Sequence, residues 1–206
     1  MKIPSAKAVA HLRAVDPVLA GVIDRVGPCQ ARAQQEGTHF GAVLRSIVYQ
    51  QLSGKAAATI HHRVLAVFGG DEPTPRALLR TDDAVLRAAG LSGQKTRYVK
   101  DLASHAAERR FPIERLHELD DDAVLATLTQ IKGVGRWTAQ MFLMFRLGRP
   151  NVLPELDLGI QKGIQRAYGL RRLPKPVQVE KRGRPWAPYR TIASWYLWRL
   201  LDLPQD

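Results

Sequence analysis

The chain has one cysteine, Cys29, among its 206 residues. A single thiol excludes an internal disulfide, and it excludes an iron–sulfur cluster ligated by four cysteines of this chain. The sequence also lacks any run of roughly 20 apolar residues, the length that a membrane-spanning helix needs. Residues 1–17 lack the apolar segment of a secretory signal. We therefore expect a cytoplasmic protein that does not enter a membrane.

Ligands for transition metals are equally sparse. His61 and His62 are adjacent in sequence, so they cannot share one face of a helix and bind a metal together. The other histidines are scattered along the chain: His11, His39, His105 and His117. The sequence therefore predicts no transition-metal site.

Acidic residues are too few to balance the basic ones. The chain has 31 Lys and Arg against 19 Asp and Glu, which gives a formal net charge of +12, and its isoelectric point is near 10.3. Such an excess favours a polyanionic partner, because phosphates neutralise the cations and release counterions. The charge thus indicates a nucleic-acid partner and association with the chromosome. A soluble basic domain without such a partner is the alternative.

Apolar residues recur at helical spacing, and the sequence predicts an all-α protein. One predicted helix begins near Phe40 and carries Val43 and Ile47 on one face. Ser53 is predicted to cap the next helix, over residues 55–68, because a serine oxygen accepts the backbone N–H groups of a first helical turn.

A later helix is predicted from residue 93 to about residue 109, with Ser92 as its cap. Phe111–Pro112 is predicted to end it. Lys95, in the first turn of this helix, is predicted to be a solvated cation.

Residues 128–139 join two predicted helices, 122–130 and 136–147, through the very short turn Gly133-Val134-Gly135. Both glycines can adopt positive φ and neither has a Cβ, which lets backbone N–H groups of the turn approach an anion such as a phosphate. Val134 is predicted to anchor the turn to the core. An ordinary corner between two helices with a glycine C-cap would fit the two glycines equally well.

The residues around this turn resemble the helix-hairpin-helix of the DNA glycosylase superfamily that is named for this hairpin and a Gly-Pro-Asp signature. The matching pattern is Leu-x-x-x-x-Gly-(Ile/Val)-Gly-x-x-Thr-Ala, with Leu128 at its start. Lys132 stands where the superfamily usually has a proline, and it adds a cation beside the expected phosphate. The resemblance implies that the DNA backbone is bound by Lys132, Gly133, Val134, Gly135 and Arg136.

The resemblance covers about residues 40–200 and implies a two-lobed helical glycosylase fold that lacks the N-terminal β domain of larger bacterial members. One lobe would span about residues 40–128 and the other residues 1–39 and 129–206, with a cleft between them. The resemblance also implies a monovalent cation at the hairpin, but no required cofactor. Its ligands would be main-chain carbonyls of Thr129, Ile131 and Val134.

A second matching segment is Ile47-Val-Tyr-Gln-Gln-Leu-Ser53, at a predicted corner between two helices. It resembles the superfamily's wedge, which enters the minor groove and fills the gap left by an extruded nucleotide. Because unstacking costs about a few kcal/mol, a side chain of about the size of a base must fill that gap. The resemblance assigns this role to Gln51 or Leu52. An exposed loop without a role is the alternative.

Asp157 ends the segment Asn151-Val-Leu-Pro154-Glu-Leu-Asp157 and precedes a predicted helix that runs to Tyr168. At this position its carboxylate is predicted to cap the helix, and capping alone could explain it. By the resemblance, Asp157 has the place of the catalytic aspartate. Such a carboxylate stabilises the oxocarbenium character of the sugar as the base departs, and it orients or deprotonates water.

Gly135-Arg-Trp137-Thr-Ala resembles the DNA-3-methyladenine glycosylase II branch, and residues 185–199 resemble its last helix, with Trp195 at the base-stacking position. The faces of these indoles attract bases that alkylation has made cationic. Met141, which would also line the base pocket, stands where the best-known bacterial member has a tyrosine. The remaining large aromatics of this segment are predicted to be core: Trp186, Tyr196 and Trp198.

Relatives that also cut the DNA strand have a nucleophilic lysine two residues after the second hairpin glycine. Trp137 holds that position here, and an indole cannot form a Schiff base. The resemblance therefore implies a monomeric, monofunctional DNA glycosylase that removes alkylated purines such as 3-methyladenine from duplex DNA. The alternatives are a non-catalytic helix-hairpin-helix DNA-binding module and a basic protein that binds RNA or the ribosome, which would leave Trp137 and Trp195 unexplained.

Overall fold

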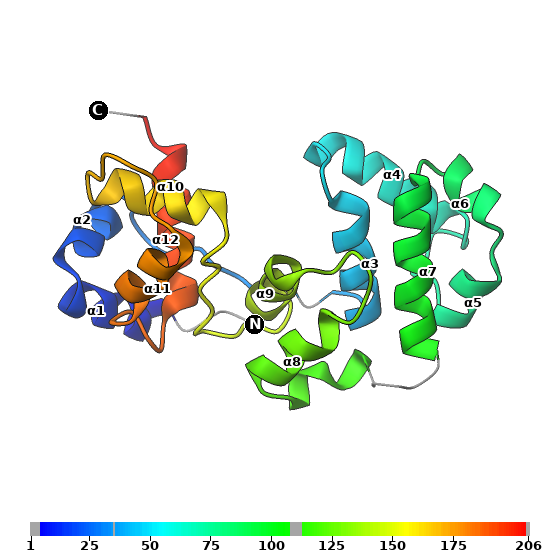
Figure 1. Cartoon of the computed structure of the whole chain (residues 1–206), viewed down its shortest axis with the longest axis horizontal. Helices are drawn as coiled ribbons and strands as arrows, with labels where there is room; N and C mark the ends of the chain where they lie inside the picture. The colour runs from blue at the N-terminus through cyan, green and yellow to red at the C-terminus, as the bar shows by residue number, and fades with distance from the viewer. Residues whose placement is uncertain (1–4, 35, 108–112, 205–206) are drawn as a thin grey trace. The chain divides into compact units, whose positions relative to one another are not determined.

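The computed structural model describes residues 5–34, 36–107 and 113–204, and these residues form helices and no β-strand (Figure 1). The predicted all-α class is confirmed. Within this part of the chain, no helix has both the length and the apolar character needed to cross a membrane. The helices, in chain order, are α1 (Ser5–Val15), α2 (Pro17–Val26), α3 (His39–Tyr49), α4 (Gly54–Ala66), α5 (Pro75–Arg80), α6 (Asp83–Ala88), α7 (Gly93–Ala107), the 3₁₀ helix η1 (Ile113–Glu118), α8 (Asp121–Leu128), α9 (Arg136–Phe145), α10 (Leu158–Ala167), α11 (Pro176–Gly183) and α12 (Arg190–Asp202).

The helices form two compact units. The central unit is Glu36–Phe142, and the terminal unit combines Met1–Gln35 with Leu143–Asp206. The central unit extends past residue 128, where the resemblance placed the boundary, because the turn after α8 is attached to α7. The backbone N–H of Lys132 donates to Asp101 of α7, and Gly133 lies directly against the ring of Tyr98.

The core of the central unit is built around α3. The predicted apolar face is fully buried, with Phe40, Leu44 and Ile47 at 2% exposure or less, and α3 packs on α4, α7 and η1. Glu114 of η1 accepts the backbone N–H groups of His39 and Phe40 at 2.8 and 2.9 Å. These hydrogen bonds hold the first turn of α3, and the helix then positions its last residue, Tyr49.

The core of the terminal unit is built around the contact of α10 with α12, which lie side by side in Figure 1. A Cβ on Gly163 of α10 would stand 2.7 Å from the carbonyl oxygen of Leu197 of α12, so only glycine permits this approach. Ile160 and Ile164 are buried beside it. The close contact fixes the first turn of α10 relative to α12.

Asp16 connects both ends of the chain within this unit. It caps α2 by accepting the N–H of Leu19 at 3.0 Å, and its other oxygen accepts the indole N–H of Trp186 at 2.8 Å and the hydroxyl of Tyr168. Burial and the neighbouring Asp16 raise the pKa of the Tyr168 phenol. Trp186 and Tyr196 are buried, as the sequence predicts.

Helix starts follow the predicted caps. The hydroxyl of Ser53 accepts the N–H of Ala56 at the start of α4, and that of Ser92 accepts the N–H of Lys95 at the start of α7. Phe111–Pro112, the predicted end of the helix that corresponds to α7, lies outside the described residues.

Candidate active site

Asp157 is the N-cap of α10 and is half-buried. Its Oδ1 atom accepts the backbone N–H of Ile160 at 2.8 Å and the indole N–H of Trp198 at 2.9 Å. One donor belongs to the first turn of α10 and the other to α12. The structure thus confirms the predicted cap, and it shows a carboxylate that two directional hydrogen bonds orient.

Trp198 is predicted to be core, but it lies at the edge of the core and donates its indole N–H to Asp157. The indole is only half-buried, packs against the edge of the core cluster and lies 5.9 Å from the Phe145 ring, centroid to centroid. Its spacing of three residues from Trp195 puts both indoles on one side of α12, and that spacing could have indicated a shared role.

Trp195 lies on α12 next to the core of the terminal unit. Its ring meets the Tyr196 ring edge to face, with centroids 5.0 Å apart and planes at 86°, and it remains half-buried. The terminal unit therefore presents Asp157, Trp195 and Trp198 from two helices in close contact.

The central unit contains a cavity of about 600 Å³ that brings together four of its predicted site residues: Gln51, Gly133, Trp137 and Met141. Trp137 and Met141 of α9 line it, together with Gly133 of the hairpin, Gln51, which is one of the two predicted wedge residues, and its neighbour Gln50. The Trp137 side chain is 45% exposed. The hairpin, the wedge and one side of the predicted base pocket thus meet at a single hollow.

The corner between α3 and α4 is held by hydrogen bonds to neighbouring elements. The side-chain amide of Gln50 donates to the Gly133 carbonyl at 2.7 Å, which joins the corner to the hairpin. The ammonium of Lys95 donates to the carbonyls of Val48 and Gln50, both at 2.7 Å. The prediction of a solvated Lys95 is therefore wrong, and burial lowers the pKa of this ammonium.

Gln51 has a φ of +56° and is the one non-glycine residue with positive φ in the described part of the chain. Its side chain is exposed, as is that of Leu52 at 40%. Side chains pay a conformational cost in this left-handed region, and such strain is typical of residues that a function holds in place. The strained backbone therefore favours Gln51 over Leu52 as the functional residue of the corner.

The two glycines of the hairpin differ. Gly133 has a φ of +81°, and a Cβ there would stand 2.1 Å from Cδ2 of Tyr98. Gly135 does not have positive φ, and a Cβ there would meet no atom within 4 Å. Val134 is 4% exposed and anchors the turn, as predicted.

Lys132 stands where the superfamily usually has a proline, and, unlike a proline, it has a backbone N–H that can donate a hydrogen bond. That N–H donates to Oδ2 of Asp101 at 2.8 Å, and the Lys132 ammonium lies 3.2 Å from Oδ1 of the same carboxylate. A proline could make neither contact. The Lys132 side chain is 73% exposed, so its charge is shared between Asp101 and solvent.

Main-chain carbonyls are the relevant ligands for a cation at the hairpin. Among the described residues, no group of three or more His, Cys, Asp or Glu side chains could hold a metal. The Thr129 hydroxyl donates to the Leu125 carbonyl at 2.8 Å and so turns away from the turn. The Ile131 carbonyl accepts the Val134 N–H at 3.0 Å, which leaves it one further lone pair. The carbonyls of Thr129, Ile131 and Val134 therefore stay the predicted ligands of the cation.

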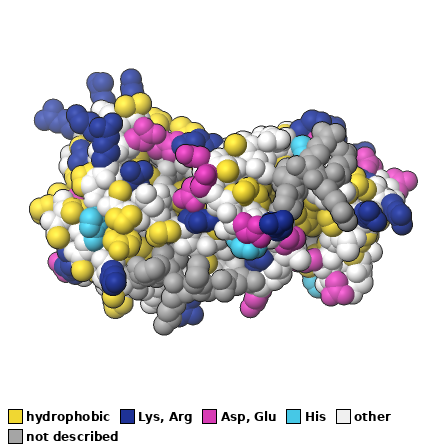
Figure 2. Space-filling view, turned by 90° about the horizontal axis from the view of Figure 1, so that it is seen from below, with side chains coloured by type: hydrophobic (Ala, Val, Ile, Leu, Met, Phe, Trp, Pro, Cys, Tyr) yellow, Lys and Arg dark blue, Asp and Glu magenta, His cyan; other side chains and the backbone are white. Residues whose placement is uncertain are grey.

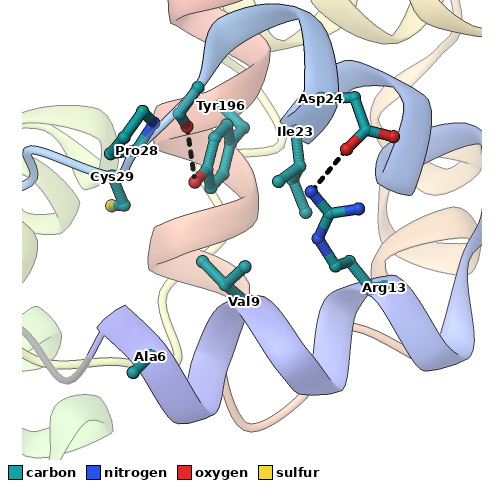
Figure 3. Close-up of a pocket in the computed structure, with 9 residues that line it drawn as sticks. Ala6, Val9, Arg13, Ile23, Asp24, Pro28, Cys29 and Tyr196 are labelled. Carbon is teal, nitrogen blue, oxygen red and sulfur yellow. Dashed lines mark hydrogen bonds and ion pairs between the residues drawn. The ribbon is translucent and has the colours of Figure 1, made fainter.

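The terminal unit has a different cavity, of about 460 Å³, between α1, the segment after α2, and α12 (Figure 3). The Tyr196 hydroxyl donates to the Gly27 carbonyl at 3.1 Å, and Arg13 pairs with Asp24 at 2.6 Å. Burial raises the pKa of the Cys29 thiol on its wall. A thiol with a raised pKa is a poor nucleophile, because less of it is present as the thiolate.

A family model described as HhH-GPD superfamily base excision DNA repair protein matches residues 44–188. DNA-3-methyladenine glycosylase 1 of Schizosaccharomyces pombe is 34% identical over 200 residues, which cover 96% of this chain and 88% of that protein. The residues that the family model matches include the corner between α3 and α4, the hairpin and Asp157.

Two solved structures share this fold. The 3-methyladenine DNA glycosylase of S. pombe, in complex with abasic DNA, aligns with a TM-score of 0.86 and 33% identity over 96% of this chain and 98% of that one. A DNA-3-methyladenine glycosidase from Bacillus halodurans aligns with a TM-score of 0.87 and 37% identity over 96% and 91%. The likeness thus extends over nearly the whole of each chain.

Proposed function

Because the chain belongs to the HhH-GPD superfamily of base excision DNA repair proteins, we propose that it is a monofunctional DNA glycosylase for alkylated purines such as 3-methyladenine in duplex DNA. The observation that carries the proposal is the position of the Asp157 carboxylate, which caps α10 and accepts the indole N–H of Trp198. The relatives named above as 3-methyladenine glycosylases support the substrate class.

The reaction is hydrolysis of the N-glycosidic bond. As the base departs, positive charge develops on the deoxyribose, and Asp157 stabilises it while orienting or deprotonating water. An N3- or N7-alkylated purine is cationic and leaves as a neutral base, so the site needs no strong general acid. Trp137 stands in place of the lysine that would form a Schiff base, and the abasic strand therefore stays intact.

Base recognition falls to the aromatic side chains. Trp137, which is 45% exposed, and the half-buried Trp195 each offer an electron-rich indole face that attracts a cationic base. Met141 lines the same cavity as Trp137, and its thioether adapts to irregular shapes. A flexible methionine at this place favours acceptance of more than one alkylated purine.

Binding to the duplex falls to the hairpin and to the basic surface. The two glycines of the hairpin and the start of α9, with the side chains of Lys132 and Arg136, hold a backbone phosphate, and main-chain carbonyls of the hairpin hold a monovalent cation. Lysine and arginine side chains gather over the terminal unit at the left of Figure 2, and its segment 171–184 has six cations and one acid. These charges attract the polyanion to the protein.

Gln51 is the proposed wedge. The substitution Gln51→Gly removes the side chain and keeps the left-handed backbone conformation. Glycine adopts a φ of +56° without strain, so we expect the melting temperature to stay the same or rise slightly. Loss of the side chain leaves the extruded nucleotide's gap unfilled, and base release should fall about 10- to 100-fold, in line with an unstacking cost of a few kcal/mol. Single-turnover base release and thermal unfolding measure both effects.

Leu52→Ala is the matched control for Gln51→Gly, because Leu52 is the neighbouring exposed residue of the corner. We expect it to retain most of the activity. A larger loss in Leu52→Ala than in Gln51→Gly would transfer the wedge to Leu52.

The proposed function is tested by incubating the protein with methylated duplex DNA and measuring free 3-methyladenine. We expect release of the free base, an intact strand before alkali treatment, and no covalent DNA adduct after borohydride reduction. DNA binding without release of a base from any lesion would show a non-catalytic DNA-binding module instead. A borohydride-trapped adduct would contradict the monofunctional mechanism.

A further inference from the structure

Trp198 of α12 and Asp157 at the start of α10 form a hydrogen bond between two helices of the terminal unit. The indole N–H of Trp198 lies 2.9 Å from Oδ1 of Asp157, and the N–H of Ile160 lies 2.8 Å from the same oxygen. A carboxylate that accepts one capping hydrogen bond can still rotate about it. A second donor from another helix removes that freedom.

The neighbouring backbone is shaped for this contact. A Cβ on Gly159 would stand 2.9 Å from Oδ1 of Asp157 and 2.9 Å from both Nε1 and Cδ1 of Trp198. Any larger residue at position 159 would push the indole away from the carboxylate. Glycine at this place in α10 therefore makes room for the hydrogen bond.

The indole is also held from its other side. Its ring lies tilted by 34° against the Phe145 ring, and it packs on the core cluster that contains Ile160 and Leu197. A donor that packing holds rigidly loses little entropy when it binds its acceptor. Packing therefore holds the N–H of Trp198 toward Asp157.

We propose that Trp198 is a positioning residue for the reaction, which fixes the orientation of the Asp157 carboxylate through the indole N–H. The inference rests on the proposed function, because it needs Asp157 to act on the sugar.

Trp198→Phe removes the N–H and keeps an aromatic ring. Under single-turnover conditions we expect base release to slow about 10- to 100-fold, the range found when a group that orients a reactive ligand is lost. Affinity for duplex DNA with an abasic-site analogue should stay within about twofold, since Trp198 is not assigned to DNA binding. Trp198→His, which restores a ring N–H, should recover part of the rate.

Trp186→Phe is the matched control. It also removes an indole N–H from an aspartate, because Trp186 donates to Asp16 at 2.8 Å, but neither residue belongs to the proposed site. We expect a lower melting temperature and an unchanged rate of base release well below that temperature. An equal loss of rate in both variants would reduce the Trp198 effect to general destabilisation and overturn the proposal.

A double-mutant cycle gives the decisive readout. If Trp198 acts through Asp157, Trp198→Phe has no further effect on the residual rate of Asp157→Asn. Independent, multiplicative losses would overturn the inference and leave the proposed function intact, as would equal rates in Trp198→Phe and the wild type. Absence of base release from the wild-type protein would instead overturn the proposed function, and this inference with it.

Discussion

Asp157→Asn is expected to slow release of 3-methyladenine by at least roughly 10²- to 10³-fold, the loss seen when a preorganised electrostatic contact to the transition state is removed. The amide oxygen of asparagine can still accept the N–H groups of Ile160 and Trp198 that now reach Oδ1. Asparagine is also as good an N-cap as aspartate. The substitution therefore removes the negative charge and keeps the hydrogen bonds.

For the same reason, we expect the melting temperature and the affinity for duplex DNA to change little in Asp157→Asn. Asp120→Asn is the matched control, because Asp120 caps α8 by accepting the N–H of Ala123 at 2.7 Å. It should affect neither stability nor base release. If Asp157→Asn released the base at the wild-type rate, capping would be the whole role of Asp157 and the catalytic assignment would be wrong.

The features that the sequence predicted correctly depend on neighbours in the chain. Helix caps at Ser53 and Asp157 require only an oxygen that reaches an N–H group three residues later. The buried face of α3 follows from the spacing of its apolar residues. The family assignment, too, came from contiguous motifs, which the matched family model supports.

The features that the sequence could not predict depend on partners far along the chain. Trp198 donates to a carboxylate 41 positions away, and Lys95 donates to carbonyls 47 and 45 positions away. A tryptophan among apolar residues reads as core, and a lysine at the start of a helix reads as solvated. Only the packing of α12 on α10 and of α7 on α3 reveals what each donor meets.

Lys132 shows the same limit. In sequence it is a departure from the proline that the superfamily usually has, and it adds a charge. In the structure, Asp101 accepts its backbone N–H and faces its ammonium from 31 positions away. The turn is therefore held by hydrogen bonds to α7 where a proline would hold it by its ring.

Gly133→Ala is expected to destabilise the protein by roughly 2 to 4 kcal/mol, which combines the strain of a left-handed alanine with displacement of a packed ring. The φ of Gly133 is +81°, and the added methyl would stand 2.1 Å from Cδ2 of Tyr98. Since about 1 kcal/mol corresponds to about 2–4 °C in a chain of this size, the melting temperature should fall by about 4–16 °C. Thermal unfolding measures this, and affinity for duplex DNA should fall as the turn moves.

Gly135→Ala is the matched substitution two residues later, and it should separate stability from binding. The backbone there does not need glycine, and a Cβ would meet no protein atom within 4 Å, so the melting temperature should stay nearly constant. If the turn holds a phosphate, the methyl enters the space that the phosphate needs, and affinity for duplex DNA should fall about tenfold or more, about 1.4 kcal/mol. Unchanged affinity in Gly135→Ala, with a stability loss in Gly133→Ala, would mean that the hairpin is only a corner between two helices and that the phosphate is held elsewhere.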